Sequence, residues 1–84
     1  MNNIELLKKK ILYRSGHRGF KEMDLLLGNF VKKNINKLSI IELKDLEKLL
    51  ITEDEILYNW YFEINPNNSI PNTKVSKMLK KFKL

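Results

Sequence analysis

The sequence predicts an all-α protein, a small five-helix bundle that forms a single domain over residues 1–84. Apolar residues recur with helical spacing in five segments, and no segment of strand length alternates between apolar and polar residues. Residues that cap helices, Asn, Ser or Thr, stand where most of these segments begin. The hydrophobic content of 43% is enough for one small core and too high for a disordered chain.

The first predicted helix is capped by Asn2 or Asn3 and runs to about Ser15, and the second extends from about Phe20 to Asn36. The apolar stripe of the first helix contains Ile4, Leu7, Ile11 and Leu12. The second helix has a broader arc, made of Phe20, Met23, Leu26, Leu27, Phe30, Val31 and Asn34. Leu25 lies on the opposite side, where an exposed apolar residue is how a partner-binding patch would begin.

Two capping-box patterns, Ser39 with Glu42 and Thr52 with Glu55, predict helices over about 39–50 and 53–63. The third helix is expected to bury its leucines, Leu43, Leu46, Leu49 and Leu50. The fourth is expected to lie at the centre, because its aromatic residues would fill a small core. These residues are Tyr58, Trp60, Tyr61 and Phe62, and the same group could instead stack nucleobases.

Residues 65–72 are rich in Asn and contain both prolines, so they predict a loop. Thr73 then caps a last, basic helix over 73–84. Its apolar side consists of Val75, Met78, Leu79 and Phe82.

Composition excludes several classes of site. The chain has no cysteine and one histidine, His17, so a disulfide, a thiolate site or a zinc centre is not expected. The longest apolar run is far too short to span a bilayer, and the N-terminus lacks the pattern of a signal or transit peptide. We therefore expect a soluble protein of the bacterial cytoplasm, or a mature chain whose presequence was left out.

Residues 18–24, Arg-Gly-Phe-Lys-Glu-Met-Asp, have the clearest features of a site. Gly19 permits a sharp turn or the close approach of another surface, and Glu22 falls in the first turn of the second helix. If Gly19 is the N-cap, Glu22 can fold back onto the backbone as a cap. Residue types alone leave this structural interpretation and a partner contact both open.

No arrangement typical of catalysis accompanies this segment. Glu22 and Asp24 would point about 200° apart on a helix, so the two carboxylates cannot act on one substrate. The sequence contains no glycine-rich phosphate loop, no nucleophile at a recognisable spacing from a base and no cluster of metal ligands. The chain is therefore not expected to be an enzyme.

Two blocks of sequence carry a resemblance. Residues 12–30 contain an Arg-Gly-x-x-Glu motif at Arg18, Gly19 and Glu22, and residues 49–60 contain a leucine pair, an acidic turn and a tryptophan helix. Over about 10–66 the chain resembles the succinate dehydrogenase assembly factor family, the flavinylation factors of bacteria and mitochondria, whose fold is a five-helix bundle. It departs from the family at residues 63–65, which replace a glycine-containing turn, and in the lysine-rich tail after Pro71.

The resemblance implies a chaperone-like factor of the tricarboxylic acid cycle. It would promote covalent attachment of FAD to a histidine of the succinate dehydrogenase flavoprotein, and some members also serve the fumarate reductase flavoprotein. It implies that FAD is held by the client and not by this chain, and that the free factor is a monomer. With an omitted presequence, the chain would belong to the mitochondrial matrix.

The same resemblance assigns roles to site residues. It implies that Arg18 and Glu22 project from the bend into the client, with Gly19 allowing close backbone approach. It also implies that the patch is bordered by Arg14, His17, Asp24 and Leu25. The resemblance favours a functional Glu22, although capping and client contact do not exclude each other.

Charge supports a different interpretation. The net charge is +6, and two basic ends flank an acidic middle. A basic helical nucleic-acid-binding or regulatory protein is therefore the alternative, although no recognition motif accompanies the lysines and nucleic acid is not the expected partner. A helical interaction module with another client is a third hypothesis.

Overall fold

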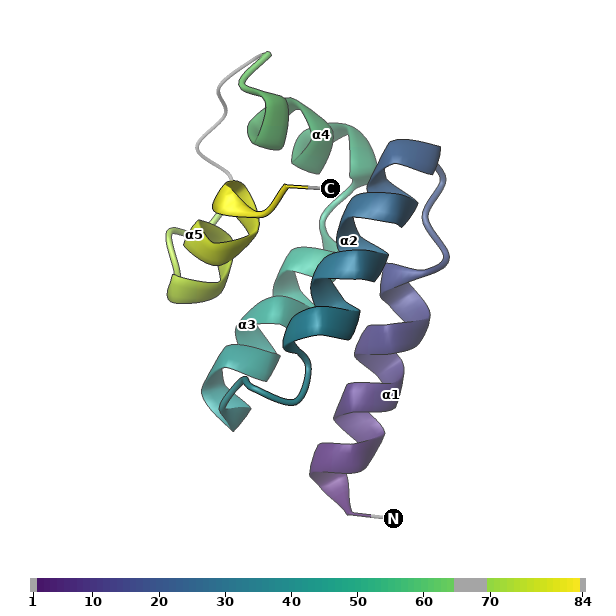
Figure 1. Ribbon diagram of the computed structural model, residues 1–84, viewed down its shortest axis with the longest axis vertical. Coiled ribbons are helices and arrows are strands. Elements are labelled where there is room, and N and C mark those ends of the chain that lie inside the picture. The colour runs from purple at the N-terminus through teal and green to yellow at the C-terminus, as the bar shows by residue number, and fades with distance from the viewer. Residues whose placement is uncertain (1, 65–69, 84) are drawn as a thin grey trace.

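In the computed structural model, which describes residues 2–64 and 70–83, the chain forms five α-helices and so confirms the predicted all-α class. The helices are α1 (Asn3–Ser15), α2 (Lys21–Asn34), α3 (Ile40–Ile51), α4 (Asp54–Phe62) and α5 (Lys74–Lys81). As Figure 1 shows, α1, α2 and α3 run up, down and up, α4 crosses one end of this bundle, and α5 lies beside α3. The domain measures 40 × 24 × 20 Å.

Side-chain caps start three of these helices, as the sequence predicts. The Asn2 side chain accepts a hydrogen bond from the Glu5 backbone N–H, at 2.8 Å. Ser39 forms the predicted reciprocal capping box with Glu42. Thr73 caps α5 in the same reciprocal way with Ser76. Local sequence therefore determines where these helices begin, because each cap satisfies backbone donors that would otherwise lack partners.

The predicted capping box of Thr52 and Glu55 is wrong. The N-cap of α4 is Glu53, whose side chain makes no capping hydrogen bond, and the Thr52 hydroxyl donates to the Lys48 carbonyl instead. Arg18 binds both the Thr52 carbonyl and the Asp54 carboxylate. These contacts hold the turn between α3 and α4 in an arrangement in which Thr52 belongs to the end of α3.

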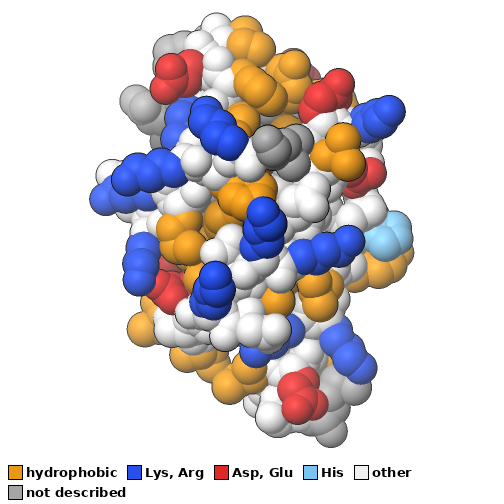
Figure 2. Space-filling view, in the orientation of Figure 1, with side chains coloured by type: hydrophobic (Ala, Val, Ile, Leu, Met, Phe, Trp, Pro, Cys, Tyr) orange, Lys and Arg blue, Asp and Glu red, His pale blue; other side chains and the backbone are white. Residues whose placement is uncertain are grey.

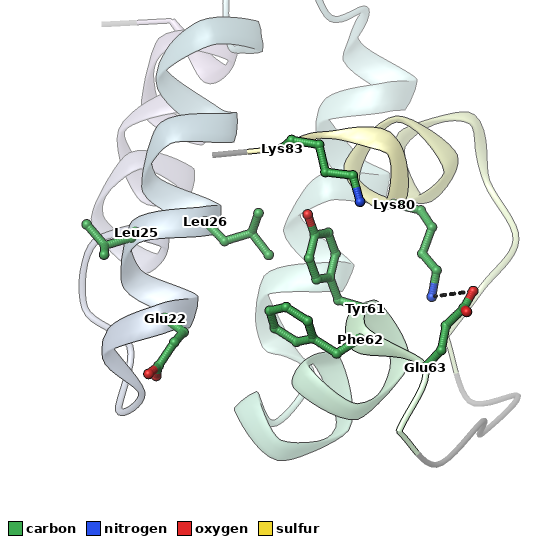
Figure 3. Close-up of a pocket in the computed structure, with 8 residues that line it drawn as sticks. All are labelled: Glu22, Leu25, Leu26, Tyr61, Phe62, Glu63, Lys80 and Lys83. Atoms are coloured by element: carbon green, nitrogen blue, oxygen red, sulfur yellow. Dashed lines mark ion pairs between the residues drawn. The ribbon is translucent and has the colours of Figure 1, made fainter.

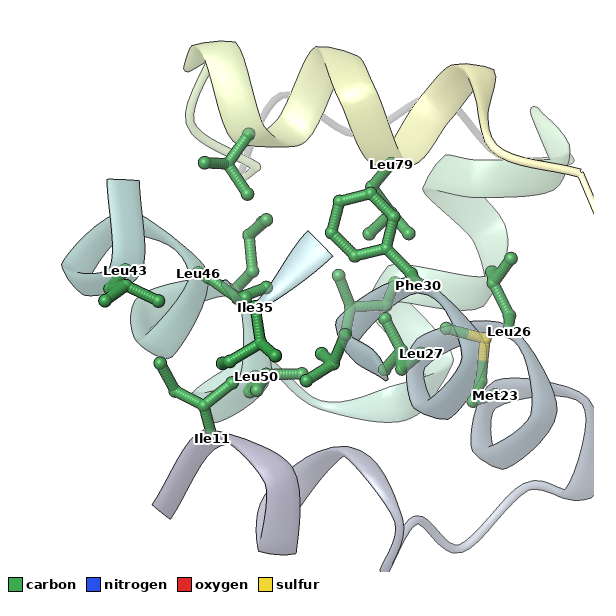
Figure 4. Packing of buried hydrophobic residues seen from close by; sticks show 14 of the residues in the cluster. Ile11, Met23, Leu26, Leu27, Phe30, Ile35, Leu43, Leu46, Leu50 and Leu79 are labelled. Carbon is green, nitrogen blue, oxygen red and sulfur yellow. The ribbon is translucent and has the colours of Figure 1, made fainter. Parts of the chain in front are cut away.

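Apolar side chains of all five helices build the core, most of them from α2 and α3. All four predicted leucines of α3 are buried. In Figure 4 the side chains of Phe30 and Leu79 meet between α2 and α5. The other fully buried apolar residues of α2 are Met23, Leu26, Leu27 and Val31. The helices lie side by side around this interior. Because Leu79 of α5 packs against Phe30 of α2, α5 covers one side of the core.

The expectation that α4 lies at the centre is also wrong. Leu57 is the buried residue of α4, whereas Tyr58, Trp60 and Tyr61 only pack against the core from outside. Phe62 is 48% exposed. The aromatic group of α4 therefore covers one end of the molecule, and buried apolar residues of the other helices occupy most of the interior. Of the predicted loop, residues 65–69 lie outside the described residues.

Across the two described ranges, no helix combines the length and the apolar character that a membrane span requires. The same ranges contain no group of three or more His, Asp and Glu side chains that could hold a metal ion.

Candidate functional site

Arg18 lies in the turn between α1 and α2, and its side chain points into the molecule. Its side chain is only 8% exposed, and its Nε and Nη2 atoms lie 2.6 and 2.5 Å from Oδ1 of Asp54. Nη1 donates to the Leu50 carbonyl at 2.6 Å and Nη2 to the Thr52 carbonyl at 2.9 Å. The planar guanidinium thus binds a carboxylate and two carbonyls of the α3–α4 turn at once.

The prediction that Arg18 projects outward is therefore wrong. The end of α3 presents carbonyl oxygens without helical partners, and a cation is favoured there. Asp54 adds a carboxylate at the same place. A buried guanidinium is stable only when such partners replace water, and here they do. The Arg18 side chain joins two turns, and only its backbone belongs to the surface of the α1–α2 turn.

The backbone of this turn is held from two sides. The Gly19 N–H donates to Oδ2 of Asp54 at 2.8 Å, and the Arg18 N–H donates to Oδ1 of Asp24 at 2.6 Å. Asp24 is thus a local support of the turn, while Gly19 itself is exposed. We call the segment from Arg18 to Glu22 the corner. Its shape is determined mainly by Asp54, which sequence analysis had included in an acidic turn without assigning it a role.

Gly19 is not required by its backbone angles, because no glycine of the described chain has a positive φ. A Cβ added to Gly19 would lie 3.5 Å from Oδ2 of Asp54, which is an ordinary contact. The fold therefore accepts a side chain here. The prediction that Gly19 allows another surface to approach closely therefore stands as a prediction.

Glu22 is exposed in the first turn of α2. The N-cap of α2 is Phe20 and not Gly19, and no side-chain hydrogen bond caps this helix. The capping interpretation of Glu22 is therefore wrong. Among the described residues its carboxylate has neither an ion pair nor a hydrogen bond, so it is free to meet an external group.

Beside Glu22 the surface is hollowed between α2, the end of α4, the end of α5 and Lys83, which follows α5 (Figure 3). We call this the α2–α4 hollow, and its volume is about 620 Å³. Its lining consists of Glu22, Leu25, Leu26, Tyr61, Phe62, Glu63, Lys80 and Lys83. The predicted exposure of Leu25 is confirmed at 49%. Leu25 also borders a smaller hollow of about 310 Å³ between α1 and α2.

The last two predicted site residues lie near the end of α1, outside the α2–α4 hollow. Arg14 and His17 are both exposed. The His17 ring stacks on Tyr13 with centroids 3.9 Å apart, and its Nδ1 lies 2.6 Å from the Tyr13 carbonyl. This contact requires a proton on Nδ1, so the imidazole donates to the carbonyl. His17 therefore extends the end of α1 and does not join the corner network.

Sequence analysis missed a strip of aromatic rings that runs from the corner to the hollow. The rings of Phe20 and Tyr58 are 5.9 Å apart, those of Tyr58 and Phe62 are 4.7 Å apart, and Phe62 meets Tyr61 at 4.8 Å. We call these four residues the aromatic strip. Phe20 is placed in it by the corner, and the other three by α4. Phe20 could have indicated this strip from the sequence, because it is an apolar residue within a motif whose other notable residues are polar.

Lysines are spread over much of the face seen in Figure 2, where hydrophobic side chains form one group at the α4 end, at the top of the view, and further groups in the middle and at the lower left. Two lysines of α5 are used within the fold. Lys74 pairs with Glu42 at 3.1 Å, and Lys80 pairs with Glu63 at 3.8 Å and donates to the Trp60 carbonyl. Part of the basic tail thus fastens α5 to α3 and α4, which weakens the nucleic-acid interpretation.

Comparison with known proteins identifies the family of this chain. Residues 9–83 match the family model described as flavinator of succinate dehydrogenase. The chain is similar to the mitochondrial succinate dehydrogenase assembly factor 2 of Dictyostelium discoideum, with 47% identity over 60 residues, 71% of this chain and 43% of the relative. It is similar to the FAD assembly factor SdhE of Acetobacter pasteurianus, with 32% identity over 80 residues, 95% of this chain and 71% of the relative.

A plant protein with the same name as the Dictyostelium relative is also similar to this chain. The mitochondrial succinate dehydrogenase assembly factor 2 of Arabidopsis thaliana is 38% identical over 81 residues, which cover 86% of this chain and 43% of the relative. The chain thus spans less than half of the Dictyostelium and Arabidopsis proteins and about 71% of the bacterial one. The family model covers nearly the whole chain, including the corner, the aromatic strip and α5. This chain belongs to the family of flavinators of succinate dehydrogenase.

Proposed function

We propose that this protein binds the flavoprotein subunit of succinate dehydrogenase and promotes the covalent attachment of FAD to it. Membership of the flavinator family supports the proposal. So do the relatives, which are named for the assembly of succinate dehydrogenase or of FAD. In this proposal FAD belongs to the client protein and is not a cofactor of this chain.

The observation that carries the proposal is the exposed carboxylate of Glu22, which has no partner within residues 2–64 and 70–83, beside the exposed backbone of Gly19. Both lie on a corner that the Arg18 and Asp54 side chains fix from inside. A fixed corner loses little conformational freedom when it meets a partner, which favours binding. Such a surface is suited to hold a client and lacks the groups for bond formation, so the client would make the bond itself.

Positioning accounts for how a binding protein can accelerate a covalent step. If the factor holds the client where the flavin and the acceptor histidine are aligned, the entropy cost of that alignment is met before the reaction. We extend the proposal to a fumarate reductase flavoprotein as a second client of the same surface. The free factor is proposed to be a monomer, which its sedimentation or elution volume would test.

The proposal is tested by flavinylation in vitro. Purified flavoprotein subunit is incubated with FAD, with and without the factor, and covalent flavin is followed by fluorescence in a denaturing gel. We expect the factor to accelerate the reaction and Glu22→Ala to reduce this effect by about tenfold. Glu5→Ala is the matched control, because Glu5 is an exposed acid in the first turn of α1, far from the corner.

Thermal unfolding separates a docking role of Glu22 from a structural one. Glu22→Ala and Glu5→Ala should unfold at similar temperatures, because each removes one exposed carboxylate from a helix N-terminus. A strongly destabilised Glu22→Ala protein would contradict the docking role. A rate of flavinylation that is the same with and without the wild-type factor would refute the proposed function as a whole.

A further inference from the structure

We propose that the client docks on the aromatic strip and into the α2–α4 hollow, which takes an apolar side chain that stands next to a basic residue of the flavoprotein. This inference rests on the proposed function and names the chemistry that the site recognises. It extends the docking surface from the polar residues of the corner to side chains of α4.

Exposed apolar side chains surround this place. Phe20, Leu25 and Phe62 are 40%, 49% and 48% exposed, respectively, and all three border the strip or the hollow. In Figure 3 Leu26 points toward Tyr61 and Phe62 across the hollow. Large aromatic and aliphatic walls around a hollow of about 620 Å³ can accommodate one side chain of a partner. Anchors of this kind supply most of the energy of protein interfaces.

The charges around the hollow specify what stands beside the anchor. It contains the carboxylates of Glu22 and Glu63, and Glu63 already lies 3.8 Å from the Lys80 ammonium. Glu22 has no ion pair among the described residues. A partner cation beside Glu22 could pair with this carboxylate, whereas Lys83 lies on the other side of Tyr61 and Phe62 in Figure 3. Opposite charges at the two sides would allow one orientation of the bound segment.

Hydrogen bonds hold the framework behind this surface. Asp54 holds the Gly19 N–H and the Arg18 guanidinium, and so fixes the backbone from which Phe20 and Glu22 extend. The Tyr61 hydroxyl donates to the Phe82 carbonyl, which holds the end of the chain against α4. Both sides of the hollow are therefore positioned before a partner arrives, and binding does not have to order them.

The test is site-specific photo-crosslinking with the purified succinate dehydrogenase flavoprotein subunit as the probe. A benzophenone amino acid replaces Phe62, which keeps an aromatic ring in the strip, or replaces Ile41 as the control. Ile41 is 71% exposed at the start of α3, at the opposite end of the bundle. We expect crosslinking from position 62 and not from position 41. Mass spectrometry should place the crosslink in a flavoprotein segment where an apolar residue adjoins Lys or Arg.

Affinity measurements with the same flavoprotein give a second, independent result. Phe62→Ala should weaken binding by about tenfold, and Ile41→Ala by less than about twofold. Glu22→Lys should weaken binding by more than Glu5→Lys, and this difference should shrink as salt is added, because the expected contact is ionic. Circular dichroism of each variant confirms that the helices are intact.

The outcomes distinguish a failure of the proposed docking surface from a failure of the proposed function. If the wild-type factor binds the flavoprotein but neither the crosslink nor the Phe62→Ala loss is seen, the α2–α4 hollow is not the docking surface and the proposed function stands. Crosslinks from position 62 to a second copy of this chain, or to an acidic flavoprotein segment, would also overturn the inference. If the wild-type factor does not bind the flavoprotein at all, the proposed function itself fails.

Discussion

Arg18 and Asp54 are 36 residues apart in the sequence, and their side chains form the contact that joins the α1–α2 turn to the α3–α4 turn. Oδ1 of Asp54 accepts a hydrogen bond from Nε of the guanidinium and forms an ion pair with Nη2. Oδ2 accepts a hydrogen bond from the Gly19 N–H. One carboxylate therefore binds two parts of the corner. The two charged residues of the Arg-Gly-x-x-Glu motif therefore have different roles. The arginine side chain supports the fold, and the glutamate side chain faces outward.

Arg18→Lys should destabilise the protein although it keeps the charge. A lysine ammonium cannot reach the carboxylate and the carbonyls of Leu50 and Thr52 together, so partly buried acceptors lose their donors. We expect a loss of about 2 kcal/mol in the free energy of unfolding, measured by urea denaturation. Arg14→Lys is the control, since Arg14 is exposed, and should change stability by less than about 0.5 kcal/mol. Equal stability of the two variants would refute the supporting role of Arg18.

Gly19→Ala should leave the fold intact and weaken client binding. The added Cβ meets only Oδ2 of Asp54, at 3.5 Å, so stability should change by less than about 1 kcal/mol. If the client backbone approaches this glycine closely, the methyl group will weaken binding to the flavoprotein by about tenfold. Gly16→Ala is the matched control, because its Cβ would also find only ordinary contacts, with Leu12 and Tyr13. Unchanged client affinity in Gly19→Ala would show that close approach does not occur there.

Glu42 should make the protein sensitive to acid. The backbone hydrogen bond from Ser39, followed by the Lys74 ammonium, lowers the pKa of Glu42 below its ordinary value of 4.5. A carboxyl with a lower pKa in the folded state contributes stability above its unfolded pKa and loses it as the pH falls through the folded pKa. Glu42→Gln should therefore be less stable than wild type near neutral pH, and the difference should shrink below about pH 4.5.

Urea denaturation across this pH range measures the Glu42 contribution, and Lys74→Gln is the informative second variant. It removes the ionic partner of Glu42 but keeps the Ser39 hydrogen bond, so part of the acid sensitivity should remain. A stability difference between wild type and Glu42→Gln that does not depend on pH would contradict the prediction.

Glu63→Gly should stabilise the protein. Glu63 ends α4 in the left-handed region, with φ 55° and ψ 34°, and is the described non-glycine residue with a positive φ. Glycine adopts these angles without the Cβ clash, so we expect a gain of about 1 kcal/mol in thermal or urea unfolding. The ion pair lost with Lys80 is long and exposed and should cost little. Glu55→Gly, within α4, should instead destabilise by about 1 kcal/mol. A less stable Glu63→Gly protein would show that the Lys80 pair outweighs the backbone effect.

The sequence by itself determined the helices. Asn2, Ser39 and Thr73 cap helices where the sequence predicts them, because a cap acts on backbone groups within one turn. The buried leucines of α3 follow from their spacing in the same way, since an apolar stripe must face the interior wherever the helix lies. The exposure of Leu25 was predictable for this reason as well.

Only the tertiary structure decided the details of the site. Local sequence favoured Thr52 as a cap and a core position for Phe62, and both expectations failed where a distant segment intervened. Arg18 turns inward because Asp54 and two carbonyls, more than 30 residues away, replace the water it loses. Phe62 remains exposed at the end of α4, and side chains of the other helices occupy most of the interior. Contacts between distant segments depend on how the helices are placed, and helical periodicity along the chain carries no information about that placement.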